Sequence, residues 1–425
     1  MSERTHMVGF YKLHTVDEAL EKIRNFIRPI DLETIEVPIE NANGMIIATD
    51  FVAPFDIPNF NRSAVDGYAV IAEDTYSASP TNPIVLKVKG TIKAGDQPMQ
   101  TKPITNGEAY EIYTGGFLPN GANAVVMAEF THRNGDFINV YKPVAPWENV
   151  SRIGEDFAKG DIVVKKGTKL RAWHIGAIVS FNVATVKVFR RLRVSLISTG
   201  NEVRKVGSDI KYGEIVESSK PMLKVLLSED GYEPIDLGIV PDDFEKISET
   251  IKSALKISDS VILTGGTSLG KTDLVPDVIS SICKPGIIVH GIAMRPAKPT
   301  GIALYDDKPI FMLSGFPVAA IIAYMVFVRP TLKMLLNQPE EPIPKIKARL
   351  SRRIAAPVGF RSFMRVKVKK TKEGYIAEPL RLTGSGILST LTKANGLLII
   401  PENIEGYEEG DEVEIILTQP IYEKE

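Results

Sequence analysis

Three uninterrupted apolar runs along the chain each stop at a Ser or Thr followed by glycine. The runs are SLISTGNEV at 195–203, VILTGGTSLGKTD at 261–273 and FMLSGFPVAA at 311–320. A strand that is buried on both faces reads as a continuous apolar run, and parallel strands end together at one edge of their sheet. We therefore expect the residues after these runs to present backbone N–H groups to one ligand, an anion and most simply a phosphate.

The hydrophobic pattern changes in the other parts of the chain. Thr15 to Ile27 has the apolar period of an amphipathic helix, with Thr15 and Glu18 as a capping box. Short strand-like runs follow from Ala64 to about Val144, with Asn134-Gly135 as a hairpin turn. Strands then alternate with helices from Val194 to Leu336, which is typical of βαβ units around a parallel sheet.

These patterns predict a multidomain protein of α/β plus β class. Its 425 residues are too many for a single hydrophobic core. The expected parts are a mixed part at 1–52 and 145–190, an inserted small β domain at 53–144, a parallel-sheet α/β domain at 191–337, and a C-terminal β domain at 338–425. The last part carries only strand signals after a Pro-rich linker, so it is either a barrel or a sandwich.

Charge and composition exclude several classes of function. With 51 Lys and Arg against 52 Asp and Glu, the chain has no global field that would hold nucleic acid or an anionic membrane. Residues 310–328 carry no charge, but Ser314, Gly315 and Pro317 are expected to break them into a strand, a turn and a buried helix, each too short to span a membrane. The first ten residues lack the apolar core of a secretion signal. Cys283 is the single cysteine and cannot form an internal disulfide, so we expect a cytoplasmic enzyme.

One motif suggests a different function. Residues 265–272, GGTSLGKT, match the phosphate loop of NTPases and follow a strand as that motif requires. In NTPases the helix begins at the Gly-Lys-Thr, whereas here Pro276 could not donate a helical hydrogen bond to Thr272. A helix that begins at Asp273 or Leu274, with Pro276 in its first turn, fits better. The only strand that could end in a magnesium-binding aspartate is the weak ALYDD at 303–307, so the NTPase interpretation is not favoured.

Eight segments in order along nearly the whole chain carry a family resemblance. They are NRSAVDGYAV (61–70), YTGGFLPNGANAVVMAE (113–129), RIGEDFAKGD (152–161), STGNEV (198–203), TGGTSLGKTD (264–273), MRPAKPTG (294–301), SGFPVAA (314–320) and GSGILSTLTKANGLLIIP (384–401). These segments resemble the MoeA family, the molybdopterin molybdenumtransferases related to the E domain of gephyrin. The resemblance implies a homodimer of four-domain subunits, with an elongated linker and dimerisation domain, a MogA-like α/β domain and a C-terminal β-barrel. In such a dimer the α/β domain of one subunit faces parts of the other.

The activity that the resemblance implies is the insertion of molybdate, or tungstate, into adenylylated molybdopterin. The reaction uses Mg²⁺ and releases AMP and molybdenum cofactor, and the molybdopterin adenylyltransferase is a candidate partner. Two alternatives remain open. The chain could itself be an adenylyltransferase, although that enzyme needs only the α/β domain, or a gephyrin-like scaffold without catalysis.

Such a reaction needs cations and N–H donors for a pyrophosphate, carboxylates for a metal and a second anion pocket for the oxyanion. The resemblance assigns catalytic roles to Asp273, Asp66, Thr114 and Glu202, and metal contacts to Asp242, Asp243, Asp273 and Asp156. The expected substrate-binding residues are Gly265, Gly266, Thr267, Ser268, Gly270, Arg295, Pro296, Lys298, Pro299, Ser314, Gly315 and Ser385.

Plainer structural roles stand beside these assignments. The glycine loop could be an ordinary tight turn, Asp273 could cap a helix, and Asp66 could form a turn before Gly67. One or two basic residues of the last domain are expected to reach an anion site across the dimer, together with Ser385, while the others form a solvated strand face. The basic set is Arg349, Arg352, Arg353, Arg361, Arg365, Lys367 and Lys369.

The chain departs from the family pattern at a few positions. Asn201 stands where the family often has aspartate, Ser314 and Phe316 stand where many members have proline and asparagine, and Arg295 and Ala297 replace the commoner lysine and glycine. These changes affect the fine contacts of the third loop and the choice of metal. The five histidines show no metal-ligand spacing and are expected to be structural or solvated.

Overall fold

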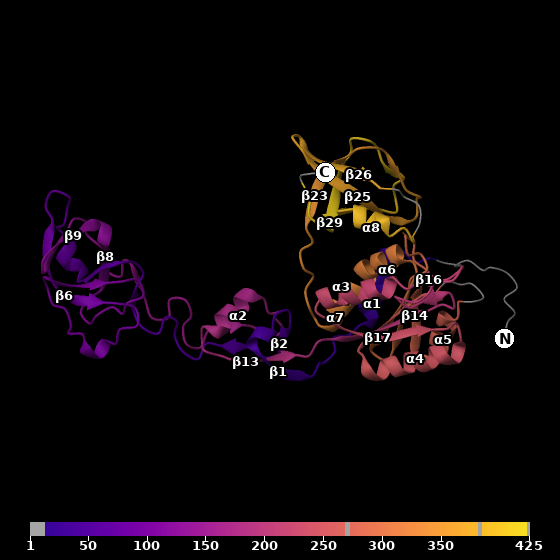
Figure 1. The fold of residues 1–425 in the computed structure, drawn as a ribbon, viewed down its shortest axis with the longest axis horizontal. Helices are drawn as coiled ribbons and strands as arrows, with labels where there is room; N and C mark the ends of the chain where they lie inside the picture. Colours follow the sequence, from indigo (N-terminus) through magenta and orange to yellow (C-terminus); the bar gives the residue numbers. More distant parts are fainter. Residues whose placement is uncertain (1–12, 268–272, 381–384, 423–425) are drawn as a thin grey trace. The chain divides into compact units, whose positions relative to one another are not determined.

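The computed structural model describes residues 13–267, 273–380 and 385–422, and Figure 1 traces the chain. It divides into two compact units, one from residues 1–33 and 190–425 and the other from Thr34–Phe189. The described residues 13–33 thus cluster with the α/β part, whereas the sequence pattern grouped residues 1–52 with the linker. The reason is α1 (Val16–Phe26), whose buried face contains Val16, Ala19 and Ile23 and packs beside α7 (Arg329–Leu335). Its predicted capping box is present.

A six-stranded sheet in the order β17-β14-β18-β22-β21-β19 forms the centre of the larger unit. The first four strands are parallel, and β21 and β19 are antiparallel additions at one edge. The three apolar runs are the neighbouring strands β14, β18 and β22, which are buried along almost their whole length. The strand bounds are Arg193–Thr199 (β14), Glu233–Val240 (β17), Ser260–Thr264 (β18), Pro285–His290 (β19), Gly301–Tyr305 (β21) and Lys308–Leu313 (β22).

Helices cover both faces of this sheet. α4 (Phe244–Ile257) and α5 (Val275–Ile282) pack on one face, and α3 (Ser219–Glu229) and α6 (Pro317–Ala323) pack on the other (Figure 1). α5 begins at Val275 with Leu274 as its cap residue and a proline in its first turn. The described helix begins where the sequence pattern placed it, with the proline in its first turn, which favours the rejection of the NTPase interpretation. The Gly-Lys-Thr of the phosphate-loop motif lies outside the described residues. Leu274 occupies the cap position, and Asp273 directly precedes it.

The uncharged segment after β22 forms the expected order of strand, turn and helix, but the helix is longer than expected. α6 continues through a π-helical turn at Tyr324–Val328 into α7, giving one helix of 19 residues from Pro317 to Leu335. Among the described residues it is the one helix long and apolar enough to cross a membrane. Tyr324 and Phe327 are fully buried, and 61% of its most apolar stretch lies inside the protein, so the helix packs as a core element.

The last part of the larger unit is a closed β-barrel. Of the two folds that the strand signals left open, the barrel is therefore the correct one and the sandwich is not. Its strands follow the order β25-β26-β23-β29-β27 and return to β25. The short strand β20 (Met294–Arg295) of the α/β part adds in parallel to the start of β25. The barrel strands are Lys345–Leu350 (β23), Arg361–Thr371 (β25), Gly374–Pro379 (β26), Gly396–Ile400 (β27) and Glu412–Leu417 (β29).

The described residues of the smaller unit form three apolar clusters. Two of them involve a six-stranded sheet that includes β5 (Gly67–Val70), β7 (Glu108–Ile112) and β8 (Ala124–Met127). The third lies between a three-stranded sheet and α2 (Ala172–Val179). The predicted hairpin joins β9 (Thr131–Asn134) to β10 (Phe137–Val140), and its loop is the pair 135–136. The four predicted domain boundaries stay predictions.

Phe327 provides a test of the packing of the long helix. Replacing its fully buried ring in Phe327→Ala should lower the free energy of unfolding by about 3–5 kcal/mol, because a cavity replaces a large apolar side chain. Val225→Ala is the control, since Val225 is 56% exposed and should change stability by less than about 0.5 kcal/mol. Urea unfolding followed by far-UV circular dichroism measures both; equal shifts would contradict the packing.

Candidate functional site

The carboxyl ends of three neighbouring parallel strands meet at one edge of the central sheet. Ser198 of β14 lies opposite Thr264 of β18, which lies opposite Leu313 of β22. The hydroxyl of Thr264 donates a hydrogen bond to that of Ser198 at 3.1 Å, and the amide of Gly265 donates to the carbonyl of Leu313 at 3.1 Å. The three Ser/Thr-Gly segments therefore adjoin one another, as their sequence pattern predicts.

Glycine is required where the second loop crosses the first. Gly265 and Gly266 both have positive φ, at 90° and 57°. A Cβ atom at Gly265 would overlap the carbonyl oxygen of Thr199, and one at Gly266 would lie 2.9 Å from the hydroxyl of Thr199. The absence of side chains lets the loop lie directly on the end of β14, so its backbone N–H groups stay close to the strand ends.

The third loop is joined to both α3 and the barrel. The hydroxyl of Ser219, at the start of α3, donates to the carbonyl of Gly315 at 2.8 Å. The hydroxyl of Ser314 accepts a hydrogen bond from the amide of Phe316 at 3.2 Å. The amide of Val318, in the first turn of α6, donates to the carbonyl of Ser385 at 3.1 Å. Ser385 of the barrel and Ser314–Gly315 are thus brought together.

Two of the predicted acidic residues lie at the same edge. The carboxylate of Glu202 is placed over Gly200, about 2.9 Å from the position of a Cβ there. Asp242 follows the end of β17, where its carboxylate accepts a hydrogen bond from the amide of Asn201 at 3.1 Å, and the side chain of Asn201 accepts one from the amide of Asp242 at 3.2 Å. Asp243 has a structural role, because its carboxylate caps α4 through the amide of Lys246 at 2.9 Å.

The loop after Gly266 is described only in part. Thr267 is buried, and Asp273 is half-buried just before α5. Ser268 and Gly270 lie outside the described residues. The expected roles of these loop residues stay predictions.

The segment with Arg295 and Lys298 lies where the α/β part joins the barrel. Arg295 pairs with Ser362 in the register of β20 and β25, and its guanidinium lies over the ring of Phe360, 5.1 Å from the centroid. Pro296 follows a cis peptide bond, and Pro299 is half-buried. The side chains of Arg295 and Lys298 are exposed, as a contact with a soluble anion requires.

Among the basic residues of the barrel, Arg365 differs from its neighbours. Its side chain is 5% exposed, and its hydrogen bonds go to the hydroxyl of Thr390 at 3.3 Å and the carbonyl of Phe363 at 2.9 Å, with no ion pair among the described residues. Several of the others have acidic partners: Arg361 binds Asp17 and Glu402, Arg353 binds Glu408, and Lys369 binds Glu378. Arg365 is therefore a buried barrel cation without an acidic partner among the described residues.

Three of the predicted residues lie in the other unit. Asp66 and Thr114 are brought together there, because the carboxylate of Asp66 accepts from both the amide and the hydroxyl of Thr114 at 2.7 Å. These bonds, first the one from the amide, lower the pKa of Asp66, so it stays ionised in mildly acidic solution. Asp156 is exposed in the same unit.

The proposed metal ligands do not form one cluster in the described part of the chain. No group of three or more His, Cys, Asp or Glu residues there has an arrangement that could hold a metal by itself. Asp242 and Asp273 belong to the larger unit, Asp243 caps a helix, and Asp156 belongs to the smaller unit. Their assignment as metal ligands stays a prediction.

Two residues at the edge were not singled out from the sequence. Because a carbonyl oxygen only accepts, Nε2 of His290 donates to the carbonyl of Thr267, at 2.9 Å, and burial lowers the pKa of His290. The hydroxyl of Thr199 is buried without a hydrogen-bond partner among the described residues. Neither role has a local sequence signal, since both depend on residues that are distant along the chain.

The close approach of Gly266 to Thr199 can be tested by a double-mutant cycle. Gly266→Ala should destabilise the larger unit by about 1–2 kcal/mol, because alanine is strained at positive φ. It also forces its Cβ against the Thr199 hydroxyl. Combining it with Thr199→Ala should recover part of this loss. Thermal unfolding of the four proteins measures the coupling, and strictly additive effects would contradict the contact.

His290 should hold the second loop in place. His290→Ala should increase hydrogen exchange of the amides at 265–267, because Thr267 loses the donor to its carbonyl. His290→Gln, which keeps an N–H donor, should restore part of the protection, and the exposed His132→Ala is the control. Exchange that is unchanged in His290→Ala would overturn this role.

The lowered pKa of His290 also predicts a pH dependence of stability. As the pH falls below about 6.5, the unfolded state gains a proton that the folded state does not yet accept, so this contribution to stability is lost. In His290→Gln the loss should be smaller over the same pH range. Urea midpoints measured at several pH values compare the two proteins.

The family to which this arrangement belongs follows from comparison with known proteins. Residues 14–182 match the region described as MoeA N-terminal region (domain I and II), residues 195–334 match the Probable molybdopterin binding domain, and residues 347–418 match the MoeA C-terminal region (domain IV). A molybdopterin molybdenumtransferase of Staphylococcus aureus is 34% identical over 404 residues, which cover 95% of each chain. A Methanocaldococcus jannaschii protein named for molybdopterin biosynthesis is 42% identical over 390 residues, covering 90% of this chain and 92% of its own.

Solved structures give the same relationship at the level of the fold. The MoeA protein of Pyrococcus horikoshii OT3 superposes with a TM-score of 0.82 at 36% identity, covering 96% of this chain and 100% of its own. The similarity thus includes the α/β domain, the small β domain and the barrel together. The chain belongs to the MoeA family.

Proposed function

We propose that this protein inserts molybdenum into molybdopterin, using adenylylated molybdopterin and molybdate, or tungstate, as substrates and releasing AMP. It is a transferase of molybdenum cofactor biosynthesis, like the molybdopterin molybdenumtransferases to which it is similar. The observation that carries the proposal is the meeting of three Ser/Thr-Gly strand ends at one sheet edge. The scaffold and adenylyltransferase alternatives are not favoured, because the similarity to transferases extends over nearly the whole chain.

The pyrophosphate of the substrate is expected to bind at the glycine loop. Backbone N–H groups around Gly265 and Gly266 lie at the end of β18, where they suit phosphate oxygens. Ser198 and Thr264 fix the strand ends through their buried hydroxyl pair, and His290 holds the carbonyl of Thr267. These residues bind and orient the substrate, so that a phosphoanhydride bond can be cleaved with AMP as the leaving group.

Mg²⁺ is part of the proposal, and the residues at the edge fit it. Magnesium is usually bound by one or two carboxylates together with substrate phosphates, so a cluster of three protein ligands is not required. Asp242 is half-buried at the sheet edge beside Asn201, and Asp273 borders the glycine loop. These two carboxylates would hold the ion, which neutralises charge on the pyrophosphate when bound.

The oxyanion needs a second, cationic pocket near the first. Arg295, Lys298 and Arg365 are the proposed cations, and Ser385 is the proposed hydroxyl donor. Arg365 supports this assignment because it is buried without an acidic partner among the described residues. Ser385 supports it because its carbonyl bonds to Val318, directly after the third loop.

A homodimer and a molybdopterin adenylyltransferase that supplies the substrate belong to the same proposal. The resemblance to the family supports both. In such a dimer the pair Asp66–Thr114 is proposed to act on the substrate as an ionised carboxylate, which its lowered pKa favours.

The decisive experiment measures AMP release from purified adenylylated molybdopterin. Release should require molybdate or tungstate together with Mg²⁺, and Asp273→Asn should reduce the rate by at least about 100-fold because it removes a charged ligand or catalytic group. Asp277→Asn is the matched control, since Asp277 is exposed in the first turn of α5. Sedimentation should give the same oligomer for all variants. Equal release without either oxyanion would overturn the proposal.

A further inference from the structure

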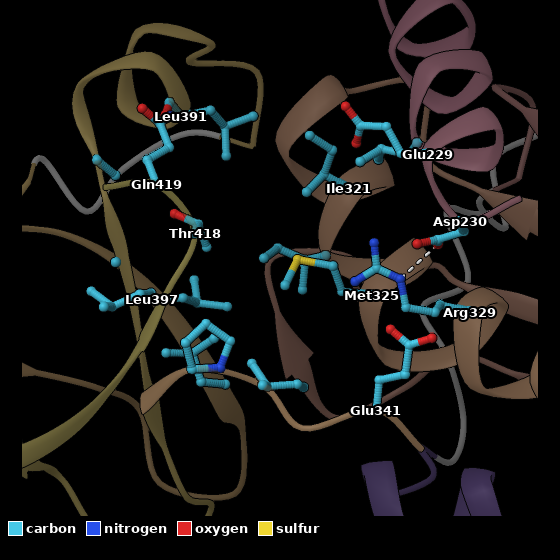
Figure 2. Close-up of a pocket in the computed structure, with 18 of the residues that line it drawn as sticks. Glu229, Asp230, Ile321, Met325, Arg329, Glu341, Leu391, Leu397, Thr418 and Gln419 are labelled. Carbon is cyan, nitrogen blue, oxygen red and sulfur yellow. Dashed lines mark hydrogen bonds and ion pairs between the residues drawn. The ribbon is translucent and has the colours of Figure 1, made fainter. Parts of the chain in front are cut away.

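A cavity of about 640 Å³ lies between the long helix and the barrel. Figure 2 shows Ile321 and Met325 of the helix on one side and Leu391 and Leu397 of the barrel on the other. The linker residues 340–344 line part of the wall. This volume is in the range of sites that enclose small molecules, and more of the lining surface is apolar than polar.

Arg329 is a cation of the cavity lining that is held in place by one acidic partner and has further N–H donors. Nε of Arg329 donates to the carboxylate of Asp230 at 2.7 Å, and the hydroxyl of Tyr324 donates to the same oxygen at 2.6 Å. The guanidinium also lies over the ring of Tyr324, 5.4 Å from the centroid. Its two terminal nitrogens form no hydrogen bond with the described residues, and Figure 2 shows them turned toward the centre of the cavity.

The charges around the cavity favour an anionic group at this position. The negative charge of Asp230 is balanced by Arg329, and its carboxylate also accepts a hydrogen bond from Tyr324. The other acidic residues of the lining, Glu229, Glu340 and Glu341, are exposed, so water screens them. The terminal edge of a guanidinium matches the two oxygens of a carboxylate, and this pairing is stronger where apolar walls exclude water.

We propose that this cavity binds an apolar monocarboxylate, such as a medium-chain acyl or aromatic acid. Its carboxylate bonds to the terminal nitrogens of Arg329, and its apolar body lies between Met325 and Leu397. This ligand is neither the pterin nor the oxyanion of the proposed reaction, although Arg365, proposed above as a cation for the oxyanion, also lines the cavity. Binding of a carboxylate to Arg329 can be measured whether or not the proposed reaction takes place.

Occupancy of the cavity should influence the site, because both of its walls continue into the site. α6 begins directly after the loop that contains Ser314 and Gly315. Leu391 belongs to α8 (Ser389–Lys393), which follows Ser385, and the carbonyl of Ser385 bonds to the amide of Val318 in α6. A ligand between these helices fixes the distance between Ser385 and the third loop. This regulatory consequence rests on the proposed function.

The test is isothermal titration of the full chain with decanoate, with decan-1-ol and decylamine as neutral and cationic probes of equal chain length. Decanoate should bind saturably with one site per chain and more tightly than either other probe. Arg329→Gln should weaken decanoate by about tenfold or more, the effect of a lost charge-assisted hydrogen bond, and leave decan-1-ol unchanged. Lys252→Gln, on α4 at the opposite face of the sheet, is the matched control.

Because Arg329→Gln could disturb Asp230 and the fold, Met325→Trp provides a second test. It should fill the cavity and abolish binding of decanoate while the far-UV circular dichroism spectrum is retained. No saturable binding, equal affinity for decanoate and decan-1-ol, or unchanged affinity in Met325→Trp would each overturn the assignment.

Hydrogen exchange separates binding from regulation. Decanoate should protect peptides that cover 314–323 and 385–393, and binding without such protection would overturn the coupling to the site. AMP release measured without decanoate tests the proposed function independently. Failure of one proposal is therefore distinguishable from failure of the other.

Discussion

The contact on which the rest of the site depends is the approach of the glycine loop to the end of β14. Gly265 lies so close to the carbonyl of Thr199 that no side chain fits between them. This contact places the ends of β14 and β18 in one layer, and the amide of Gly265 ties that layer to β22 through Leu313. Without it, the three strand ends would still be parallel, but the backbone of the glycine loop would not lie against the end of β14. The same contact leaves the hydroxyl of Thr199 buried without a hydrogen-bond partner among the described residues.

The barrel is connected to this edge by backbone pairing as well as by side chains. β20 leaves the α/β part and pairs with the first residues of β25, so Arg295 lies in register with Ser362. Next to it, Arg361 forms a two-pronged bond with Asp17 of α1, at 3.0 and 2.7 Å, and a further bond with Glu402. These bonds raise the pKa of Arg361 and keep it charged. A binding site built from both parts needs such fixed connections. If the two parts moved freely, substrate binding would have to order them, and the loss of conformational entropy would weaken the affinity.

Much of this arrangement could be predicted from the sequence because it depends on local patterns. Continuous apolar runs identify β14, β18 and β22 as buried strands, and their small terminal residues identify the edge. The capping box of α1 and the first-turn proline of α5 are also local signals that the structure confirms. The β-barrel followed from the resemblance, since strand signals alone leave barrel and sandwich equally open.

Other features depend on contacts between distant residues, which no local pattern encodes. The packing of α1 with the α/β unit follows from its contacts with α7, more than 300 positions away. Asp243 carries the expected carboxylate, yet its position at the start of α4 gives it a capping bond. His290 looked structural because it has no histidine or cysteine neighbour in sequence. Its function as a loop support appears only once β19 and the glycine loop lie together.

The presence of asparagine at position 201, where the family often has aspartate, has an electrostatic explanation in the contact with Asp242. Asn201 and Asp242 exchange hydrogen bonds, each accepting from the amide of the other at 3.2 and 3.1 Å. An aspartate at 201 would keep the acceptor oxygen but place a second carboxylate beside that of Asp242, and like charges at this distance repel. Asparagine keeps both bonds and removes one negative charge from the edge. Glu202 and Asp242 already lie there, so the proposed pyrophosphate site gains from one carboxylate fewer at this edge, because less cationic charge is then needed to hold the anion.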